Sequence, residues 1–234
     1  MDKEVAWSSE DPFIHTKKTS FMQRLSDRVR QGATLYIEGQ TPLKRVPALV
    51  EKLSQRWPLN LTKMQASRRS RAGQGTYYWL GWLEEDSQLV HWFVLHKPGA
   101  EIDRTDRWRE VLDDRLNLTG YELVRHTRSG ASAPAWTWRY TKQRFADLRD
   151  LLVADIRGRK DLQAAQLMHT LYRSPGFAGV REQVKKLRQL CLGEWKRSRG
   201  KDSMFEIPRN IGYVSRLADK GVTWSLLAKQ SNVS

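Results

Sequence analysis

The chain has 234 residues and carries 41 lysines and arginines against 26 aspartates and glutamates, a formal net charge of +15. The surplus positive charges repel one another in a compact protein unless an anionic partner is bound. Nucleic acid is therefore the expected partner. A membrane partner is not expected, because no run of about 18 apolar residues is present and the N-terminus lacks the basic start of a signal peptide. The single cysteine, Cys191, excludes an internal disulfide. We therefore expect a soluble, cytoplasmic protein.

The first quarter of the chain predicts an arm, a helix, a strand and a second helix. Residues 1–19 mix charges with Ser, Thr and Pro without a period, which is typical of a flexible arm. Apolar residues every four positions then predict a helix from Ser20 to Gly32, and residues 33–39 predict a strand. A second helix is expected between Thr41 and Trp57, where Pro47 would delay its start or kink it.

A basic segment lies before the most aromatic part of the sequence. Residues 60–65 predict a strand, and the following SRRSRAGQG, residues 67–75, predicts a loop. Residues 76–84 and 88–97 are aromatic and β-branched and are separated by three polar residues, which predicts a hairpin. Both faces of its first strand are apolar, so we expect a central strand that is covered on both sides.

The middle of the chain predicts a helix, a hairpin and another helix. A charged helix of about ten residues is expected next, with Trp108, Val111, Leu112 and Leu116 on its buried side. Residues 121–127 and 134–141 predict a second hairpin. Thr141 is a suitable cap for a helix that ends at Gly158.

The C-terminal part is helical and basic. Helices are expected from Asp161 and from Ser174–Pro175 onward, and the last thirty or so residues predict an extended segment. The sequence thus predicts an α+β protein with a mixed or mainly antiparallel sheet of about six strands and flanking helices. Its expected parts are an arm (1–19), a sheet domain (20–158) and a basic helical region with an extended tail (159–234).

The basic segment 67–75 is a candidate phosphate-binding loop. Arg68, Arg69 and Arg71 offer forked donors that match phosphate oxygens, and Gly73 and Gly75 would let the backbone approach a ligand. The segment lacks the order of a nucleotide-binding P-loop. The alternative is a solvated connection that is basic without a ligand.

A second candidate lies on the helix expected up to residue 199. Five basic residues fall within about 80° of one another on a helical projection: Arg181, Lys185, Arg188, Lys196 and Arg199. Residues 139–201 carry sixteen basic and six acidic side chains. Phosphate contacts along this stripe would weaken steeply with salt. The alternative is an ordinary solvated helix face.

Aromatic residues beside cations could stack on nucleobases. The candidates are Tyr77, Trp79, Trp92, Trp136 and Trp138, of which Trp138 next to Arg139 is the strongest. The alternative is that these rings form the core of the sheet.

Enzymatic signals are few. His91 and His96 are five residues apart, which sends them to opposite faces of one strand and prevents a shared metal. Glu101, Asp103 and Asp106 could bind Mg²⁺ for phosphodiester cleavage, although acids at a helix start also favour its dipole. The ExK order of Glu194 to Lys196 falls on an expected helix, and Cys191 is expected to be a buried apolar residue. We expect no catalytic residue, metal or cofactor.

The favoured interpretation is a non-catalytic nucleic-acid-binding protein, with DNA favoured over RNA. A metal-dependent nuclease and a basic adaptor for an acidic protein stay open as alternatives, and protein partners in a nucleoprotein complex fit the first interpretation. In size, charge and tryptophan content the chain resembles accessory proteins by which plasmids and other mobile elements replicate or transfer DNA. This resemblance assigns no residue a role.

Overall fold

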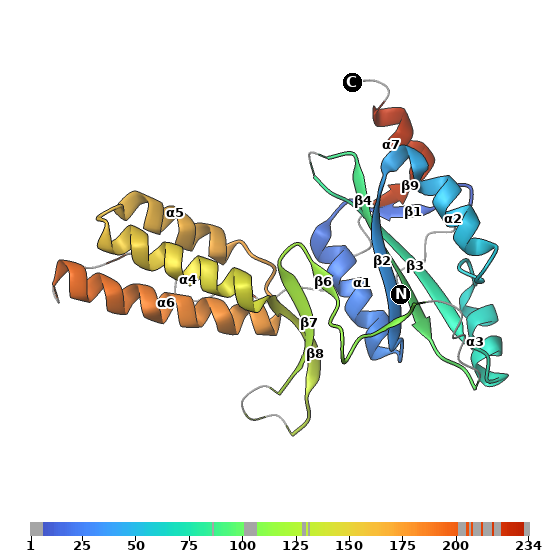
Figure 1. Ribbon diagram of the computed structural model, residues 1–234, viewed down its shortest axis with the longest axis horizontal. Coiled ribbons are helices and arrows are strands. Elements are labelled where there is room, and N and C mark those ends of the chain that lie inside the picture. Colours follow the sequence, from blue (N-terminus) through green and yellow to red (C-terminus); the bar gives the residue numbers. More distant parts are fainter. Residues whose placement is uncertain are drawn as a thin grey trace. The chain divides into compact units, whose positions relative to one another are not determined.

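The computed structural model describes residues 7–85, 87–100, 107–127, 130, 132–200, 205, 207, 212, 217 and 221–231. The fold is α+β, as the sequence predicts (Figure 1). The chain forms two compact units: Met1–Asp114 together with Arg216–Ser234, and Arg115–Ser215. The sequence interpretation placed the boundary at 158, so the second hairpin, expected in the sheet domain, lies in the second unit.

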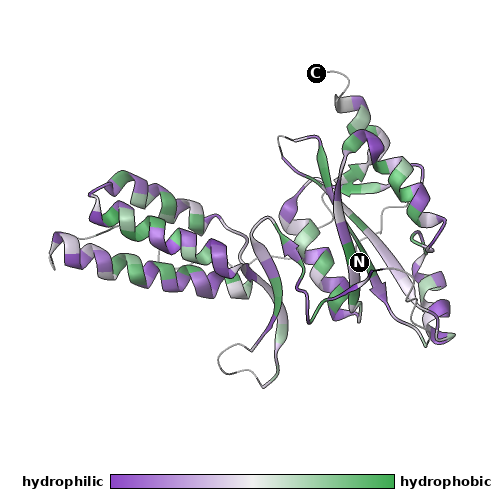
Figure 2. Ribbon diagram, viewed as in Figure 1, coloured by the Kyte–Doolittle hydropathy of each residue, from purple (hydrophilic) through white to green (hydrophobic). Residues whose placement is uncertain are grey.

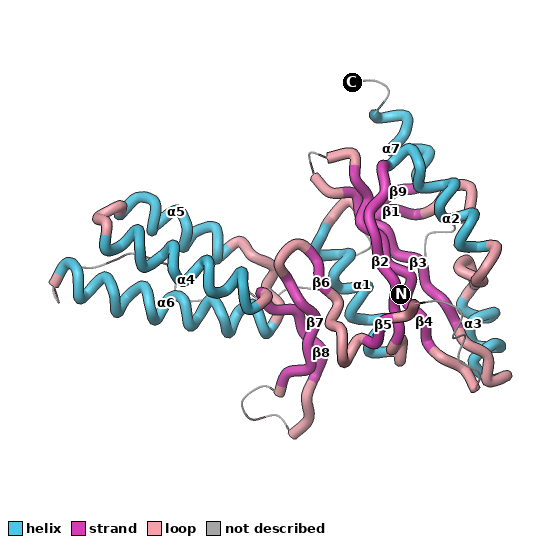
Figure 3. The backbone as a smooth tube through the Cα atoms, viewed as in Figure 1, coloured by secondary structure: helices cyan, strands magenta, loops and turns pink. Residues whose placement is uncertain are grey.

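The first unit contains a six-stranded sheet in the order β5-β2-β4-β3-β1-β9. All its neighbouring strands are antiparallel except β1 and β3. The two long aromatic strands are paired from Thr76–Lys97 to Leu83–Val90, which confirms the first predicted hairpin (Figure 3). The strands are β1 (Phe13–His15), β2 (Leu35–Pro42), β3 (Thr76–Leu83), β4 (Leu89–Lys97), β5 (Arg109–Glu110) and β9 (Gly221–Thr223).

One face of this sheet is covered by α1 (Lys18–Arg30). The four-residue apolar spacing buries Phe21, Leu25 and Val29, as expected for one stripe of an amphipathic helix. The Phe21 ring lies 6.0 Å from that of Phe93 and 6.2 Å from that of Trp82. The predicted helix is confirmed.

The opposite face is covered by the short helix η1 (Leu43–Arg45), α2 (Val46–Ser54) and α7 (Trp224–Ser231). Pro47 stands in the first turn of α2, where its missing N–H has no intrahelical partner to lose. The predicted late start is therefore correct. Because helices cover both faces of β3, its predicted central position in the sheet is also confirmed.

Both ends of the chain join this sheet. Strand β1 comes from the segment expected to be an arm, and β9 with α7 comes from the segment expected to be extended. The Asp11 carboxylate accepts hydrogen bonds from the backbone N–H of Ser225 at 2.8 Å and from its hydroxyl at 2.9 Å. Burial acts against ionisation of Asp11, but these bonds outweigh it and lower its pKa. The three-residue strands are too short to leave a period in the sequence.

The second unit pairs a three-stranded sheet with three helices, as predicted for the second hairpin and the helical region. Figure 2 shows hydrophobic and hydrophilic residues alternating along its helices. The strands are β6 (Asn117–Leu118), β7 (Tyr121–His126) and β8 (Ala135–Tyr140), and the helices are α4 (Lys142–Arg157), α5 (Asp161–Tyr172) and α6 (Ala178–Arg199).

The prediction of a charged helix bearing Trp108, Val111, Leu112 and Leu116 is wrong. Its residues form β5, a turn and β6. Val111 is buried while its neighbour Leu112 is 62% exposed, so their spacing did not mark a helical face. The other expected elements of this unit are present: the Thr141 side chain accepts from the N–H of Arg144 and caps α4.

Candidate nucleic-acid interface

The segment before the aromatic hairpin is a helix, not a strand followed by a loop. Helix α3 spans Lys63–Arg71. Its start is a capping box: the Thr62 hydroxyl accepts from the N–H of Gln65 at 3.3 Å, and the Gln65 side chain accepts from the N–H of Thr62 at 2.9 Å. This Thr-x-x-Gln signal stands in the sequence and was missed, because the alternating NLTKMQ also fits a strand.

Helix α3 has no buried residue. Its nine residues include four cations and no acid, and the sequence has no acidic residue between Glu51 and Glu84. A helix that is polar all round is not formed to complete a core. The cations in its last turn do favour the helix dipole, but that effect does not require the exclusion of acids from the whole segment.

The three arginines predicted to act together are separated by the structure. Arg69 turns inward, and its Nε donates to the carbonyl oxygen of Gly75 at 3.2 Å. Arg68 and Arg71 are exposed, and neither makes an ion pair with any residue that the structure describes. Arg69 therefore holds the turn after α3, whereas the other two are available to an anion.

The glycines of this segment serve the protein's own packing, not the approach of a ligand. Gly73 has a φ of +70°, and its carbonyl accepts from the N–H of Ala100 at 2.6 Å. A Cβ on Gly75 would lie 2.5 Å from the ring of His96. The close backbone approach that the sequence predicted for a ligand is thus made by the end of β4 and the residues after it.

Arg71 lines a surface pocket of about 370 Å³ in the first unit. The pocket takes its polar lining from four elements: Gln31 after α1; Ser67, Ser70 and Arg71 on α3; Thr76 and Tyr78 on β3; and Lys97 on β4. None of the described residues that line it is acidic. The sequence interpretation did not include Tyr78 or Lys97, because only the sheet register brings β3 and β4 beside α3.

The α6 stripe is only partly free for a ligand. Arg199 is paired with Asp161 of α5 through two of its N–H groups. Arg188 lies against the hydroxyl of Tyr172. Burial raises the pKa of Tyr172 and Arg188 lowers it, and the net effect is an increase. Lys185 and Lys196 are exposed and make no ion pair within the described part of the chain, and Arg181 is half-buried.

The two carboxylates of α6 are engaged by side chains outside the predicted stripe. Glu182 pairs with Lys186 at 3.0 Å and with His126 at 2.8 Å. The hydrogen bond from Lys186 is the main reason that the pKa of Glu182 is lowered. Glu194, which is 5% exposed at its side chain, is bound by Arg157 at 3.0 Å and Arg197 at 2.7 Å. The stripe lysines therefore keep their charge unopposed by these acids.

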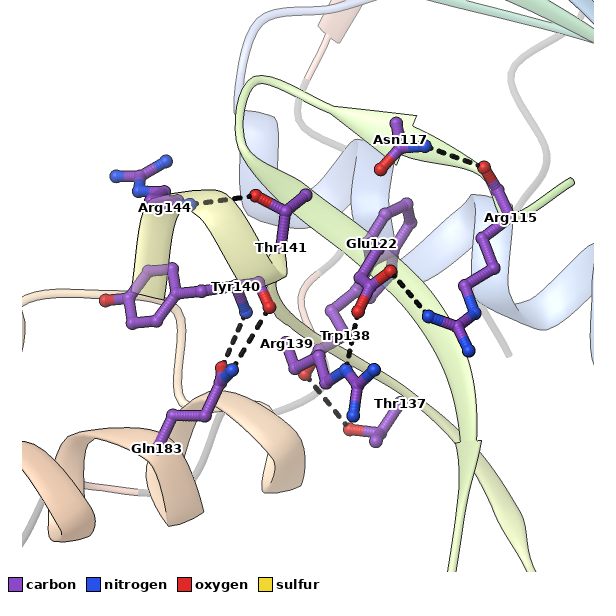
Figure 4. Close-up of polar contacts among 10 residues, drawn as sticks. All are labelled: Arg115, Asn117, Glu122, Thr137, Trp138, Arg139, Tyr140, Thr141, Arg144 and Gln183. Carbon is purple, nitrogen blue, oxygen red and sulfur yellow. Dashed lines mark hydrogen bonds and ion pairs between the residues drawn. The ribbon is translucent and has the colours of Figure 1, made fainter. Parts of the chain in front are cut away.

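Trp138 is wholly buried, so it presents no surface to a base. Arg139 beside it is bound to Glu122: its Nε donates to Oε1 at 2.7 Å, and Arg115 donates to Oε2 at 2.9 Å (Figure 4). The burial of Trp138 contradicts its predicted role in stacking, and the nucleic-acid contact predicted for Arg139 would compete with its ion pair to Glu122. Trp138 and Arg139 belong to the packing between β7, β8 and α6.

The other proposed stacking residues are also core residues for the most part. Tyr77 and Trp79 are less than 10% exposed, and Trp92 stacks on Trp79 with ring centroids 6.0 Å apart. Trp136 is half-buried. The alternative interpretation, that aromatic residues at strand spacing form the core, is the correct one for β3 and β4.

The residues considered for catalysis are not brought together within the described part of the chain. Glu101, Asp103 and Asp106 lie outside the described residues, and the described residues contain no cluster of three metal ligands. His91 stacks on Trp82 and His96 on Tyr77, which confirms that the two histidines face opposite sides of the sheet. Glu194 of the ExK sequence is on a helix and held by two arginines. Burial raises the pKa of Cys191 to about 11, as expected of an unreactive core thiol.

Comparison with protein-family models, curated proteins and solved structures found no match for this chain. Within the described helices, none is long and apolar enough to cross a bilayer. The geometry of the chain itself is therefore what bears on function. Among the cations predicted to bind nucleic acid, Arg68 and Arg71 of α3 and Lys185 and Lys196 of α6 are exposed without an ion pair to described residues, and Lys97 lies beside α3.

Proposed function

We propose that this protein binds nucleic acid, with DNA favoured over RNA, through phosphate contacts and without catalysis. The primary surface is α3 with the end of β4, and the exposed lysines of α6 form a second surface on the other unit. A role beside the replication or transfer of DNA of a mobile element is compatible with this proposal and rests on composition alone.

The observation that carries the proposal is the combination of no buried residue and no acidic residue in α3. Solvated helices usually mix charges, since opposite charges three or four residues apart stabilise a helix by about 0.2–0.5 kcal/mol per pair and like charges destabilise it by similar amounts. Arg68 and Arg71 form such a like-charge pair. A polyanion would relieve this repulsion, and release of its counterions would contribute to binding.

An acidic protein partner is the main competitor to this proposal. Arginine recognises carboxylates as well as phosphates, so charge alone does not separate the two. A nuclease is the other competitor, and a plasmid-cleavage assay with Mg²⁺ and with EDTA tests it directly.

The decisive experiment is fluorescence anisotropy with single- and double-stranded DNA and RNA over a salt series. We expect log Kobs to fall linearly with log salt, by about 0.9 per phosphate contact on duplex DNA or about 0.7 on a single strand. The double variant Arg68→Gln with Arg71→Gln should weaken binding. It should also reduce the slope of log Kobs against log salt by the amount expected for about 2 phosphate contacts.

The matched control is Arg45→Gln with Lys52→Gln. These two residues are also exposed, lie in the same unit on η1 and α2, and make no ion pair with described residues. The control should bind like the unmodified protein. Equal effects of the two double variants, or no binding of any nucleic acid at moderate salt, would contradict the proposal and favour the adaptor.

A further inference from the structure

The pocket beside α3 carries a more specific inference, which rests on the proposed function. We infer that it binds a phosphomonoester, the terminal phosphate of a nucleic-acid strand. Its lining combines two cations, Arg71 and Lys97, with four hydroxyl groups and the Gln31 amide. Its volume of about 370 Å³ lies within the range of small-ligand pockets and suffices for a phosphate with its nucleotide.

The density of donors favours a terminal over an internal phosphate. An internal phosphodiester has one charge and two free oxygens, whereas a terminal phosphate carries about 1.5 to 2 charges at pH 7 and three strong acceptor oxygens. Two cations, the Gln31 amide and the hydroxyls of Ser67, Ser70 and Tyr78 line this one pocket, while the Thr76 hydroxyl donates to that of Tyr78. A monoester can accept hydrogen bonds from more of them at once, so it leaves fewer donors unsatisfied.

The lining side chains are held by neighbouring structure. The Thr76 hydroxyl donates to the Tyr78 hydroxyl at 3.1 Å, and the guanidinium of Arg28 lies 4.2 Å from the centre of the Tyr78 ring. Thr76 is directly opposite Lys97 in the sheet register. Groups carried by paired strands keep their positions better than groups on loops, which suits recognition of a compact anion.

The α3 part of the lining follows from helix geometry. Ser67, Ser70 and Arg71 are spaced i, i+3 and i+4, so they share one face of the helix. That face is turned toward β3 and the pocket, while Arg68 lies elsewhere on the helix and does not line it. Arg71 is thereby placed to contact a terminal phosphate as well as the backbone, whereas Arg68 contacts the backbone alone.

The experiment compares one oligonucleotide sequence with a 5′-phosphate, a 3′-phosphate or hydroxyl groups at both ends. We expect one phosphorylated end to bind about tenfold more tightly than the hydroxyl form, the contribution of one added charge-assisted hydrogen bond. Inorganic phosphate and deoxyadenosine monophosphate should compete with the phosphorylated end, and they should remove only this tenfold increment in affinity. Lys97→Met and Arg71→Gln should abolish it, whereas the matched Lys52→Met and Arg45→Gln should preserve it.

Tyr78→Phe keeps the ring under Arg28 and removes only one hydroxyl, so it tests the pocket even if Lys97→Met fails to fold. It should reduce the increment. Equal affinity for phosphorylated and hydroxyl ends overturns the inference and leaves the proposed function standing. Binding of the free nucleotide without binding of any oligonucleotide supports the phosphomonoester chemistry of the pocket and overturns the proposed function.

Discussion

The side-chain amide of Gln183 on α6 forms two hydrogen bonds with the backbone of Tyr140 on β8 (Figure 4). Its Oε1 accepts from the Tyr140 N–H at 2.7 Å, and its Nε2 donates to the Tyr140 carbonyl oxygen at 3.1 Å. Strand β8 is at the edge of its sheet, where unpaired backbone groups could pair with another chain. Helix α6 thus takes the place of a neighbouring strand at this position.

Replacing Gln183 with alanine should destabilise the second unit by about 2 kcal/mol, because two backbone groups lose their partners. Hydrogen exchange should show the larger local effect, with faster exchange of the Tyr140 amide. The control is Gln189→Ala, an exposed glutamine on the same helix. If the Tyr140 amide exchanges equally slowly in the Gln183 variant, the two hydrogen bonds do not stabilise the edge strand β8.

The sequence predicts those elements of this fold whose period is long enough to be seen. Helices α1 and α6 repeat buried residues along most of their length, and the β3–β4 hairpin carries eight or nine residues a strand. The two- and three-residue strands leave no such pattern. Helix α3 was missed for another reason: it buries nothing, so its only helical signals are local, at Thr62 and Gln65.

The candidate site was predictable in part. Its arginines, Arg68 and Arg71, were predicted because an acid-free basic segment is visible in the sequence, whereas Lys97 was not. The pocket was not, since it depends on Lys97 being opposite Thr76 in the sheet and on α3 lying beside β3, which are long-range relationships. Likewise, periodicity grouped Arg199 with Lys196, but only the packing of α5 against α6 brings Asp161 to Arg199.

The stability of the second unit should depend on pH through Glu194. Hydrogen bonds from Arg157, and the charges of Arg157 and Arg197, lower the pKa of this carboxyl below its ordinary value of 4.5. The stabilisation is therefore fully present above pH 4.5, where the unfolded chain is also ionised, and is lost as the pH falls through the lower folded pKa. Glu194→Gln should lower the free energy of unfolding by about 2 kcal/mol at neutral pH. The variant's stability, measured by urea unfolding, should also fall less as the pH is lowered into the acid range.

Asp150→Asn is the control for that experiment. Asp150 pairs with Arg149 at 2.8 Å on an exposed part of α4, where water and salt screen the interaction. The Asp150→Asn variant should keep nearly the same urea midpoint at pH 7 and nearly the same loss of stability at acid pH. If Glu194→Gln behaves like this control, the two arginines do not stabilise the buried carboxylate.

The last prediction separates the conformation of α3 from its charge. Thr62→Ala removes the hydroxyl that accepts from Gln65 and should destabilise α3 by about 1 kcal/mol. Because α3 buries no residue, the rest of the first unit should keep its unfolding transition, and the net charge does not change. Under the proposed function, fraying of α3 should weaken nucleic-acid binding at constant salt slope, and it should reduce the preference for a phosphorylated end. Thr62→Ser, which keeps the cap, should restore both. If Thr62→Ala frays the helix, as hydrogen exchange of its amides would report, and yet binds normally, then α3 acts through charge alone and its helical form has no part in recognition.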